Sequence, residues 1–186
     1  VDARHDRLRD WIRDWLAHVC GLSSAKTEQH VQEWDKWFQA TDANGAPKYT
    51  TEDTPDGPRR VPFMAVKMAK LDVSFVDDEG VQGYVDVAYT NACSFDAAST
   101  LRAARTPGKA ASEREEHKRK RYPPEHHPHA ALIPFVVEAR GRLGAEVLPF
   151  LKQHAPAEEP LRSAVLARAL HDISIITQQG LAALLL

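Results

Sequence analysis

The sequence predicts a mixed α/β (α+β) fold, a central β-sheet flanked by helices. Hydrophobic residues recur at helical spacing near both ends of the chain, and they alternate with polar residues in two adjacent runs near the middle. The resulting order is helix, strands, helix, strand and helices. With 186 residues, 43% of them hydrophobic, the chain has enough apolar side chains for the core of one domain.

Composition excludes several classes of protein. The apolar content and the formal net charge of −2 argue against gross disorder, and no apolar stretch is long enough to span a membrane. The first residues lack a basic, apolar signal segment. Cys20 and Cys93 are far apart and form no CxxC motif, which argues against a disulfide scaffold or a zinc ribbon. We therefore expect an intracellular protein, nuclear or cytoplasmic, in a reducing compartment.

The first third of the chain predicts a helix, a short strand and a loop. Residues 3–20 carry apolar side chains at helical spacing, and Gly21 is a suitable stop: Leu8, Trp11, Ile12, Trp15, Leu16, Val19 and Cys20. Thr27–Val31 has the character of a short strand. Residues 39–62 are rich in Pro, Gly, Thr and Asp without periodicity, so we expect a long loop or excursion there.

The middle of the chain predicts a β-hairpin followed by a helix. Ala69–Phe75 and Val81–Thr90 read as strands joined by a turn over residues 76–80. Residues 97–121 look helical, with an interruption near Pro107 and Gly108. The segment YPPEHHP over residues 122–128 must end that helix.

The last third predicts a buried strand and two helices. Leu132–Ala139 is a compact apolar run typical of a buried strand. Residues 141–154 read as a short helix and Leu161–Leu186 as a long one. The long helix has an apolar face that consists of Leu161, Val165, Leu166, Ala169, Leu170, Ile173 and Ile176.

Charge is segregated along the chain. Residues 71–101 contain six acidic residues and no Lys or Arg, whereas residues 102–121 contain eight basic residues and three acidic ones. Carboxylates beside a basic stretch are compatible with a metal site next to a phosphate-binding surface. The same pattern also fits an acidic turn followed by a solvated helix, and charge alone does not separate the two.

Two aspartates within the predicted hairpin are the main candidates for chemistry. Asp72 lies in LDVSF and Asp86 in YVDVAYT, with thirteen residues between them. Their apolar neighbours point to the other sheet face, so pairing of the strands would place both carboxylates on one face. Such a pair repels unless a cation or a proton intervenes, and Mg²⁺ or Mn²⁺ prefers oxygen ligands. The alternative is two solvent-facing aspartates at strand edges.

The basic segment EREEHKRKRYPP supplies Lys118 and Lys120, and a cation near an attacked phosphate is what phosphodiester hydrolysis requires. Taken together, Asp72, the Asp86–Val87 pair and the run Lys118 to Tyr122 resemble the restriction-like endonuclease domain of site-specific non-LTR retrotransposons, within the PD-(D/E)XK nuclease superfamily. The family pattern is an Asp ending one strand, Asp-Val in the next, and K-x-x-K-Y on a helix. The opening Arg4-His5-Asp6 and the run IPFVVEARGRLG also resemble family segments.

The sequence departs from the family pattern in three places. Leu71 stands where the family usually has Pro, Arg121 replaces the second Lys, and the long gap from Asp86 to Lys118 implies an insertion around residues 95–112. The resemblance implies a single restriction-like endonuclease domain over residues 1–186. Its core would cover about residues 4–140, with a helical C-terminal extension over residues 141–186.

The resemblance implies a Mg²⁺-dependent (or Mn²⁺-dependent) DNA endonuclease. Asp72 and Asp86 would hold the metal, and Lys118 would replace the usual in-strand lysine because that position is Ala88, with Lys120 as the alternative. Glu28 would be a further ligand or a water-orienting acid. In these elements the domain nicks one DNA strand, and the new 3′ end primes reverse transcription, so a reverse transcriptase region of the same polyprotein is an expected partner. This chain would then be a fragment of a longer protein.

Other residues suggest contacts with DNA or with another protein. DNA contacts are expected from Lys120, Arg119, Arg121, Tyr122 and Arg140; the alternatives are that Tyr122 caps the helix and that Arg140 is a surface residue. The histidines at positions 117, 126, 127 and 129 favour an exposed turn over a zinc site. The tryptophans at helical spacing favour core packing over base stacking.

Two further functions remain open from the sequence. One is a catalytically inactive nucleic-acid-binding or protein-interaction module on the same fold. The other is a helix-rich partner-binding domain, in which the apolar end of the last helix packs on the core or forms a homodimer through Leu181, Leu184, Leu185 and Leu186.

Overall fold

The computed structural model describes residues 3–91, 100, 101 and 105–183. These residues divide into two compact units, where the sequence indicated one domain. We call residues 1–29 and 71–186 the core unit and residues 30–70 the hairpin unit. The predicted insertion over residues 95–112 falls partly outside the described residues, as do Cys93 and Leu184, Leu185 and Leu186.

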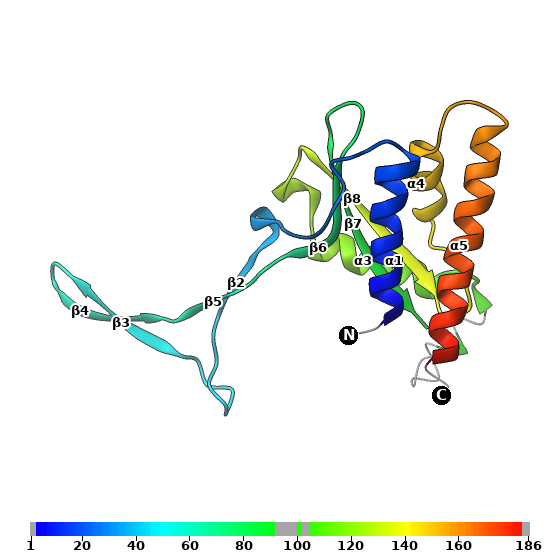
Figure 1. Ribbon diagram of the computed structural model, residues 1–186. Helices are drawn as coiled ribbons and strands as arrows, with labels where there is room; N and C mark the ends of the chain where they lie inside the picture. Colours follow the sequence, from blue (N-terminus) through cyan, green and yellow to red (C-terminus); the bar gives the residue numbers. More distant parts are fainter. Residues whose placement is uncertain (1–2, 92–99, 102–104, 184–186) are drawn as a thin grey trace. The chain divides into compact units, whose positions relative to one another are not determined.

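A four-stranded mixed sheet forms the centre of the core unit, which confirms the predicted fold class (Figure 1). Its order is β1 (Lys26–His30), β6 (Lys70–Val76), β7 (Gln82–Thr90) and β8 (Ala130–Glu138). Strands β6 and β7 pair antiparallel, as the predicted hairpin requires, and β7 and β8 pair parallel. The bounds of all four strands lie within a few residues of the predicted ones.

The hydrophobic core lies where the alternating strands meet the helices. Leu71, Val73 and Phe75 on β6 and Val85 and Val87 on β7 are almost fully buried. On β8, buried residues run without interruption from Pro134 to Glu138, which is the pattern of a strand covered on both faces. The aromatic part of this core consists of Trp15, Phe75, Phe135 and Phe150.

Helices α1 (Ala3–Asp14) and α5 (Leu161–Ala183) lie side by side in the core unit (Figure 1). The predicted helix over residues 3–20 is present, but its last turn, η1 (Trp15–Val19), is π-helical, and Gly21 with φ +76° ends it. A Cβ atom on Gly180 of α5 would overlap the Arg4 side chain, so the glycine lets the two helices approach closely.

The apolar face predicted for α5 is partly wrong. Ala169 and Ile173 are buried as expected, but Leu161 and Leu170 are 50% and 37% exposed. Thr177 and Gly180 take the next buried positions, because the face toward α1 needs small side chains there. Among the described helices, none is long and apolar enough to cross a membrane.

Helix α3 (Lys109–Arg121) follows Gly108, whose φ of +81° marks the predicted interruption. It packs against β7 and β8. The segment YPPEHHP ends α3 as expected and contains a short 3₁₀ turn, η3 (Pro124–His126). Helix α4 (Val147–His154) is shorter than the predicted 141–154, because residues 141–146 form a turn with Gly141 at φ +89°.

Residues 39–62, where we expected a long loop or excursion, form paired strands within the hairpin unit, so the expectation of an irregular loop is wrong. After a 3₁₀ turn, η2 (Gln32–Trp34), the chain forms two antiparallel ribbons: β2 (Lys36–Gln39) pairs with β5 (Met64–Lys67), and β3 (Tyr49–Thr54) pairs with β4 (Gly57–Pro62). Asp35 fastens the first ribbon, because it accepts a hydrogen bond of 2.7 Å from the backbone N–H of Ala69 and pairs with His30 at 2.8 Å.

Candidate active site

Asp72 and Asp86 lie on adjacent antiparallel strands. The β6–β7 register pairs Val73 with Val85, so the next position outward sets Asp72 opposite Asp86. The backbone N–H of Val87 donates a hydrogen bond of 2.7 Å to Asp72 Oδ2, which ties the first carboxylate to the second strand. Both side chains are largely buried, at 15% and 6% exposure. The structure therefore brings the two predicted aspartates together.

The two carboxylates titrate differently because their surroundings differ. Burial raises the pKa of Asp86 to about 6; the Lys118 ammonium opposes this shift, and the charge of Asp72 adds to it. Burial also acts to raise the pKa of Asp72, but the hydrogen bond and charge of His5 and the Val87 N–H outweigh it, so that pKa is lowered. A positive charge beside the two buried carboxylates would therefore stabilise their ionised forms.

Helix α3 carries that positive charge on a polar inward face. Its buried side chains are Ala111, Glu115 and Lys118, at the i, i+4, i+7 spacing of one helical stripe. Lys118 Nζ lies 2.7 Å from Asp86 Oδ2 and 3.5 Å from the backbone oxygen of Val87. Ala111 packs on Ala88 and Val136, so small residues on the sheet allow α3 to lie close enough for the lysine to reach the aspartate.

Lys120 is placed differently from Lys118. Its side chain is 74% exposed and forms an i, i+4 ion pair of 2.6 Å with Glu116. The difference of two positions, about 200° around a helix, turns one lysine inward and the other toward solvent. Of the two candidates that the sequence left open, the structure brings Lys118 to the aspartates.

The other predicted DNA-contacting residues have mixed surroundings. Arg119 pairs with Glu146, and the guanidinium of Arg121 lies 5.0 Å from the ring centre of Tyr122. Arg140 is exposed in the turn after β8. These residues lie on or beside α3 and the end of β8, whereas Lys118 forms an ion pair with Asp86.

Tyr122 is almost fully buried at the end of α3, which favours the capping role over direct contact with DNA. Its backbone N–H donates to the Lys118 carbonyl and closes the helix. Burial, reinforced by the charge of Asp86, raises the pKa of its hydroxyl to about 12. The hydroxyl of the buried ring therefore stays protonated and neutral at physiological pH.

His5 is a member of the site that the reasoning from sequence did not assign. It comes from the first turns of α1, and its Nε2 lies 3.2 Å from Asp72 Oδ2. The hydrogen bond to Asp72 raises the pKa of His5 above its ordinary value, against the effect of burial. The opening Arg4-His5-Asp6 segment was a signal that this region belongs to the site, but the distance along the chain concealed the contact.

Glu28 forms its ion pair with a residue outside the arrangement of Asp72, Asp86 and Lys118. It is on β1, has φ +56°, and its half-exposed carboxylate pairs with Arg9 at 2.9 Å. Among the described residues, no three or more His, Cys, Asp or Glu side chains gather in a way that would hold a metal ion. Glu28 pairs with Arg9 in this structure, and its role as a further ligand or water-orienting acid stays a prediction.

Two other buried acids hold the helices in place. Glu115 accepts a hydrogen bond from the Glu146 N–H, just before α4, and Glu138 accepts one from the Ala111 N–H in the first turn of α3. Carboxylates at helix N-termini satisfy backbone N–H groups that lack partners within the helix. These contacts fix α3 on the sheet and hence the position of Lys118.

No protein-family model matches this chain, and no curated protein matches it. The function must therefore be inferred from the arrangement itself. Two nearly buried carboxylates with different pKa values, beside a buried lysine, form a site that can take up a cation and an anionic substrate.

Proposed function

We propose that this chain is a metal-dependent DNA endonuclease that hydrolyses a phosphodiester bond and nicks one strand. The observation that carries the proposal is the contact between Lys118 and Asp86, with Asp72 opposite on the neighbouring strand. Three residues distant in sequence converge here, and two acids with one lysine are the groups that the family resemblance assigns to catalysis.

The donor set suits Mg²⁺ or Mn²⁺. Asp72 and Asp86 offer hard carboxylate oxygens, and Mg²⁺ is commonly bound by one or two carboxylates together with waters and substrate phosphates. Burial keeps the pKa of Asp86 raised to about 6 even with Lys118 beside it, so a bound cation would further stabilise the ionised carboxylate. When bound, such a cation polarises the phosphate and promotes ionisation of a water.

The chain's own residues then have distinct roles. Asp72, held by His5 and the Val87 N–H, and Asp86 would hold the cation. Lys118 would donate hydrogen bonds to a non-bridging phosphate oxygen or to the attacking water, which stabilises the negative charge that develops during in-line attack. Arg119, Lys120, Arg121 and Arg140 would contact the DNA backbone. We leave Glu28 out of this set.

The setting of the activity follows from the family resemblance. A nicking domain of a non-LTR retrotransposon would supply the 3′ end from which a reverse transcriptase region of the same polyprotein begins synthesis. Such a domain would meet its DNA in the nucleus or cytoplasm.

A plasmid-nicking experiment tests the proposal. The chain should convert supercoiled plasmid to the open circular form with Mg²⁺ or Mn²⁺ and not with EDTA. Asp72→Ala and Asp86→Ala should each reduce the rate by about 10³-fold or more, in line with the several kcal/mol that a metal site supplies. Asp78→Ala, at an exposed acid of the β6–β7 turn, is the matched control.

Circular dichroism would show whether each variant keeps its fold. Nicking that survives in both aspartate variants would contradict the proposal.

A second candidate is a catalytically inactive nucleic-acid-binding module. The observation that favours it is that Lys118 already neutralises Asp86 in an ion pair of 2.7 Å, so the pair is tolerated without a metal. This module would bind DNA through the basic end of α3 and give no metal-dependent nicking.

A further inference from the structure

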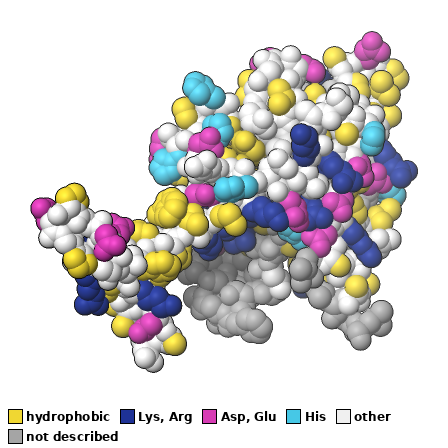
Figure 2. Space-filling model, turned by 60° about the vertical axis from the view of Figure 1, so that its left-hand side comes forward, with side chains coloured by type: hydrophobic (Ala, Val, Ile, Leu, Met, Phe, Trp, Pro, Cys, Tyr) yellow, Lys and Arg dark blue, Asp and Glu magenta, His cyan; other side chains and the backbone are white. Residues whose placement is uncertain are grey.

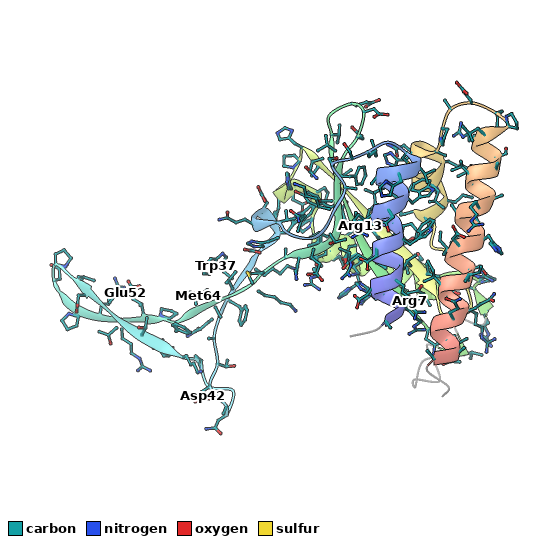
Figure 3. The ribbon with its side chains drawn as sticks, viewed as in Figure 1. Arg7, Arg13, Trp37, Asp42, Glu52 and Met64 are labelled. Carbon is teal, nitrogen blue, oxygen red and sulfur yellow. The ribbon has the colours of Figure 1, made fainter. Side chains whose placement is uncertain are left out.

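The ribbon of β2 and β5 in the hairpin unit has two different faces. Its register pairs Lys36 with Lys67 and Phe38 with Ala65, and these four side chains share one face. Trp37, Gln39, Met64 and Val66 share the other face. Trp37 and Met64 project from the ribbon in Figure 3, and Trp37 is 67% exposed.

The lysine face combines unmatched positive charge with an open aromatic ring. Lys36 and Lys67 stand directly opposite each other, an arrangement that destabilises a sheet. Within the described part of the chain, neither has an ion pair, and the eight residues of the ribbon include no acid. Phe38 is 49% exposed, and only the methyl group of Ala65 stands across from it, so its ring can accept a flat partner.

The neighbouring ribbon of β3 and β4 differs in that its charges are matched. Glu52 pairs in register with Arg59, and the guanidinium of Arg60 lies 4.0 Å from the ring centre of Tyr49. Arg60 and Tyr49 therefore already contact each other inside the ribbon, and Arg59 stands across from an acid rather than another cation. Hydrophobic side chains and Lys or Arg side chains both reach the surface of the hairpin unit (Figure 2), but only the β2–β5 ribbon leaves both without a partner among the described residues.

We propose that the Lys36–Phe38–Lys67 face binds single-stranded DNA, with a base stacked on Phe38 and the flanking phosphates on the two lysines. Stacking on an aromatic ring beside cations is the usual way to hold unpaired bases without reading their sequence. A paired duplex hides its base faces and would not engage Phe38. The choice of DNA over RNA rests on the proposed function, whereas the stacking and charge argument does not.

Fluorescence anisotropy of a labelled oligothymidylate tests this binding with the full chain in EDTA, where metal-dependent nicking cannot interfere. Phe38→Ala should weaken binding about 5- to 100-fold, the effect of losing one stacked base. The double variant Lys36→Gln, Lys67→Gln should reduce the slope of log affinity against log salt by about 1.4, for two lost phosphate contacts.

Trp37→Ala is the matched control, because it removes an exposed aromatic residue from the same strand but from the other face. It should leave binding within about twofold, and Phe38→Trp should preserve it. Equal losses in Trp37→Ala and Phe38→Ala would overturn the assignment of this face. Tighter binding of oligouridylate, or of a duplex of equal length, would overturn the choice of ligand.

The inference and the proposed function can fail separately. Phe38-dependent binding in a chain that never nicks plasmid would support this inference and contradict the endonuclease. Metal-dependent nicking with no measurable binding of oligothymidylate would overturn the inference and leave the endonuclease intact.

Discussion

Lys118 in the core unit and Lys67 in the hairpin unit show how differently the two units use charge. Lys118 is 8% exposed and lies 2.7 Å from Asp86, whereas Lys67 is exposed and faces another lysine across its ribbon. Aromatic residues follow the same division, with Phe135 fully buried and Phe38 49% exposed. A buried charge must be paired within the folded protein, whereas water solvates an exposed charge, which therefore remains available to bind a ligand. We therefore interpret the core site as preformed and the ribbon as a surface completed by its partner.

The largest expected difference between the units is in packing. Phe135→Ala should lower the free energy of unfolding by about 4 kcal/mol, because it leaves a cavity among Phe150 and its neighbours. Phe38→Ala should change it by no more than about 0.5 kcal/mol, since the ring is half exposed. Urea denaturation followed by circular dichroism measures both values. A loss above about 2 kcal/mol in Phe38→Ala would show that the ribbon is packed rather than open.

The next largest effect concerns the two lysines of α3. Lys118→Ala should destabilise the fold by about 3 kcal/mol, because it leaves Asp86 buried without its partner until that carboxyl takes up a proton. It should also reduce plasmid nicking by about 10²-fold or more. Lys120→Ala, at an exposed i, i+4 pair, should cost at most about 0.5 kcal/mol. Similar effects of the two substitutions would mean that α3 does not present Lys118 to the sheet.

A pH series sharpens the interpretation of the core site. The pKa of Asp86 is raised to about 6, so below that pH this carboxyl is protonated and a cation must displace the proton. The apparent affinity for Mn²⁺, measured by titration calorimetry, should therefore fall up to about tenfold per pH unit below pH 6. Asp86 is not part of the ribbon, so the affinity for oligothymidylate should not show this dependence on pH. An Mn²⁺ affinity unchanged between pH 5 and pH 7 would exclude Asp86 as a ligand.

The smallest effect is expected at Glu28, an exposed acid of the core unit. Its pair with Arg9 lies at the surface, and such pairs contribute about 0–1 kcal/mol. Glu28→Gln should therefore leave nicking within about threefold of the wild-type rate and stability nearly unchanged. A loss as large as that of Asp86→Ala would restore Glu28 to the ligand set that the family resemblance implies.

Local patterns predicted most of the core unit. Alternation with a period of two identified β6 and β7, and the same parity placed Asp72 and Asp86 on one face. The hairpin unit was missed because its strands bury little: Tyr49–Thr54 carries mostly polar, exposed side chains, so no hydrophobic period marks it. Of the Gly and Pro residues behind the predicted loop, Gly45 and Pro55 do lie in turns, but Gly57, Pro58 and Pro62 lie within β4.

What the sequence alone determined was the fold class, the four sheet strands and the pair of acids, because local composition and short-range periodicity indicate them. What only the tertiary structure decided was which lysine meets those acids and that His5 joins them. The phase of α3 depends on how Ala111 packs on Ala88 and Val136 and on how Glu138 holds the first turn of the helix. His5 reaches Asp72 across 67 residues of chain, and only packing of α1 against the sheet brings them together.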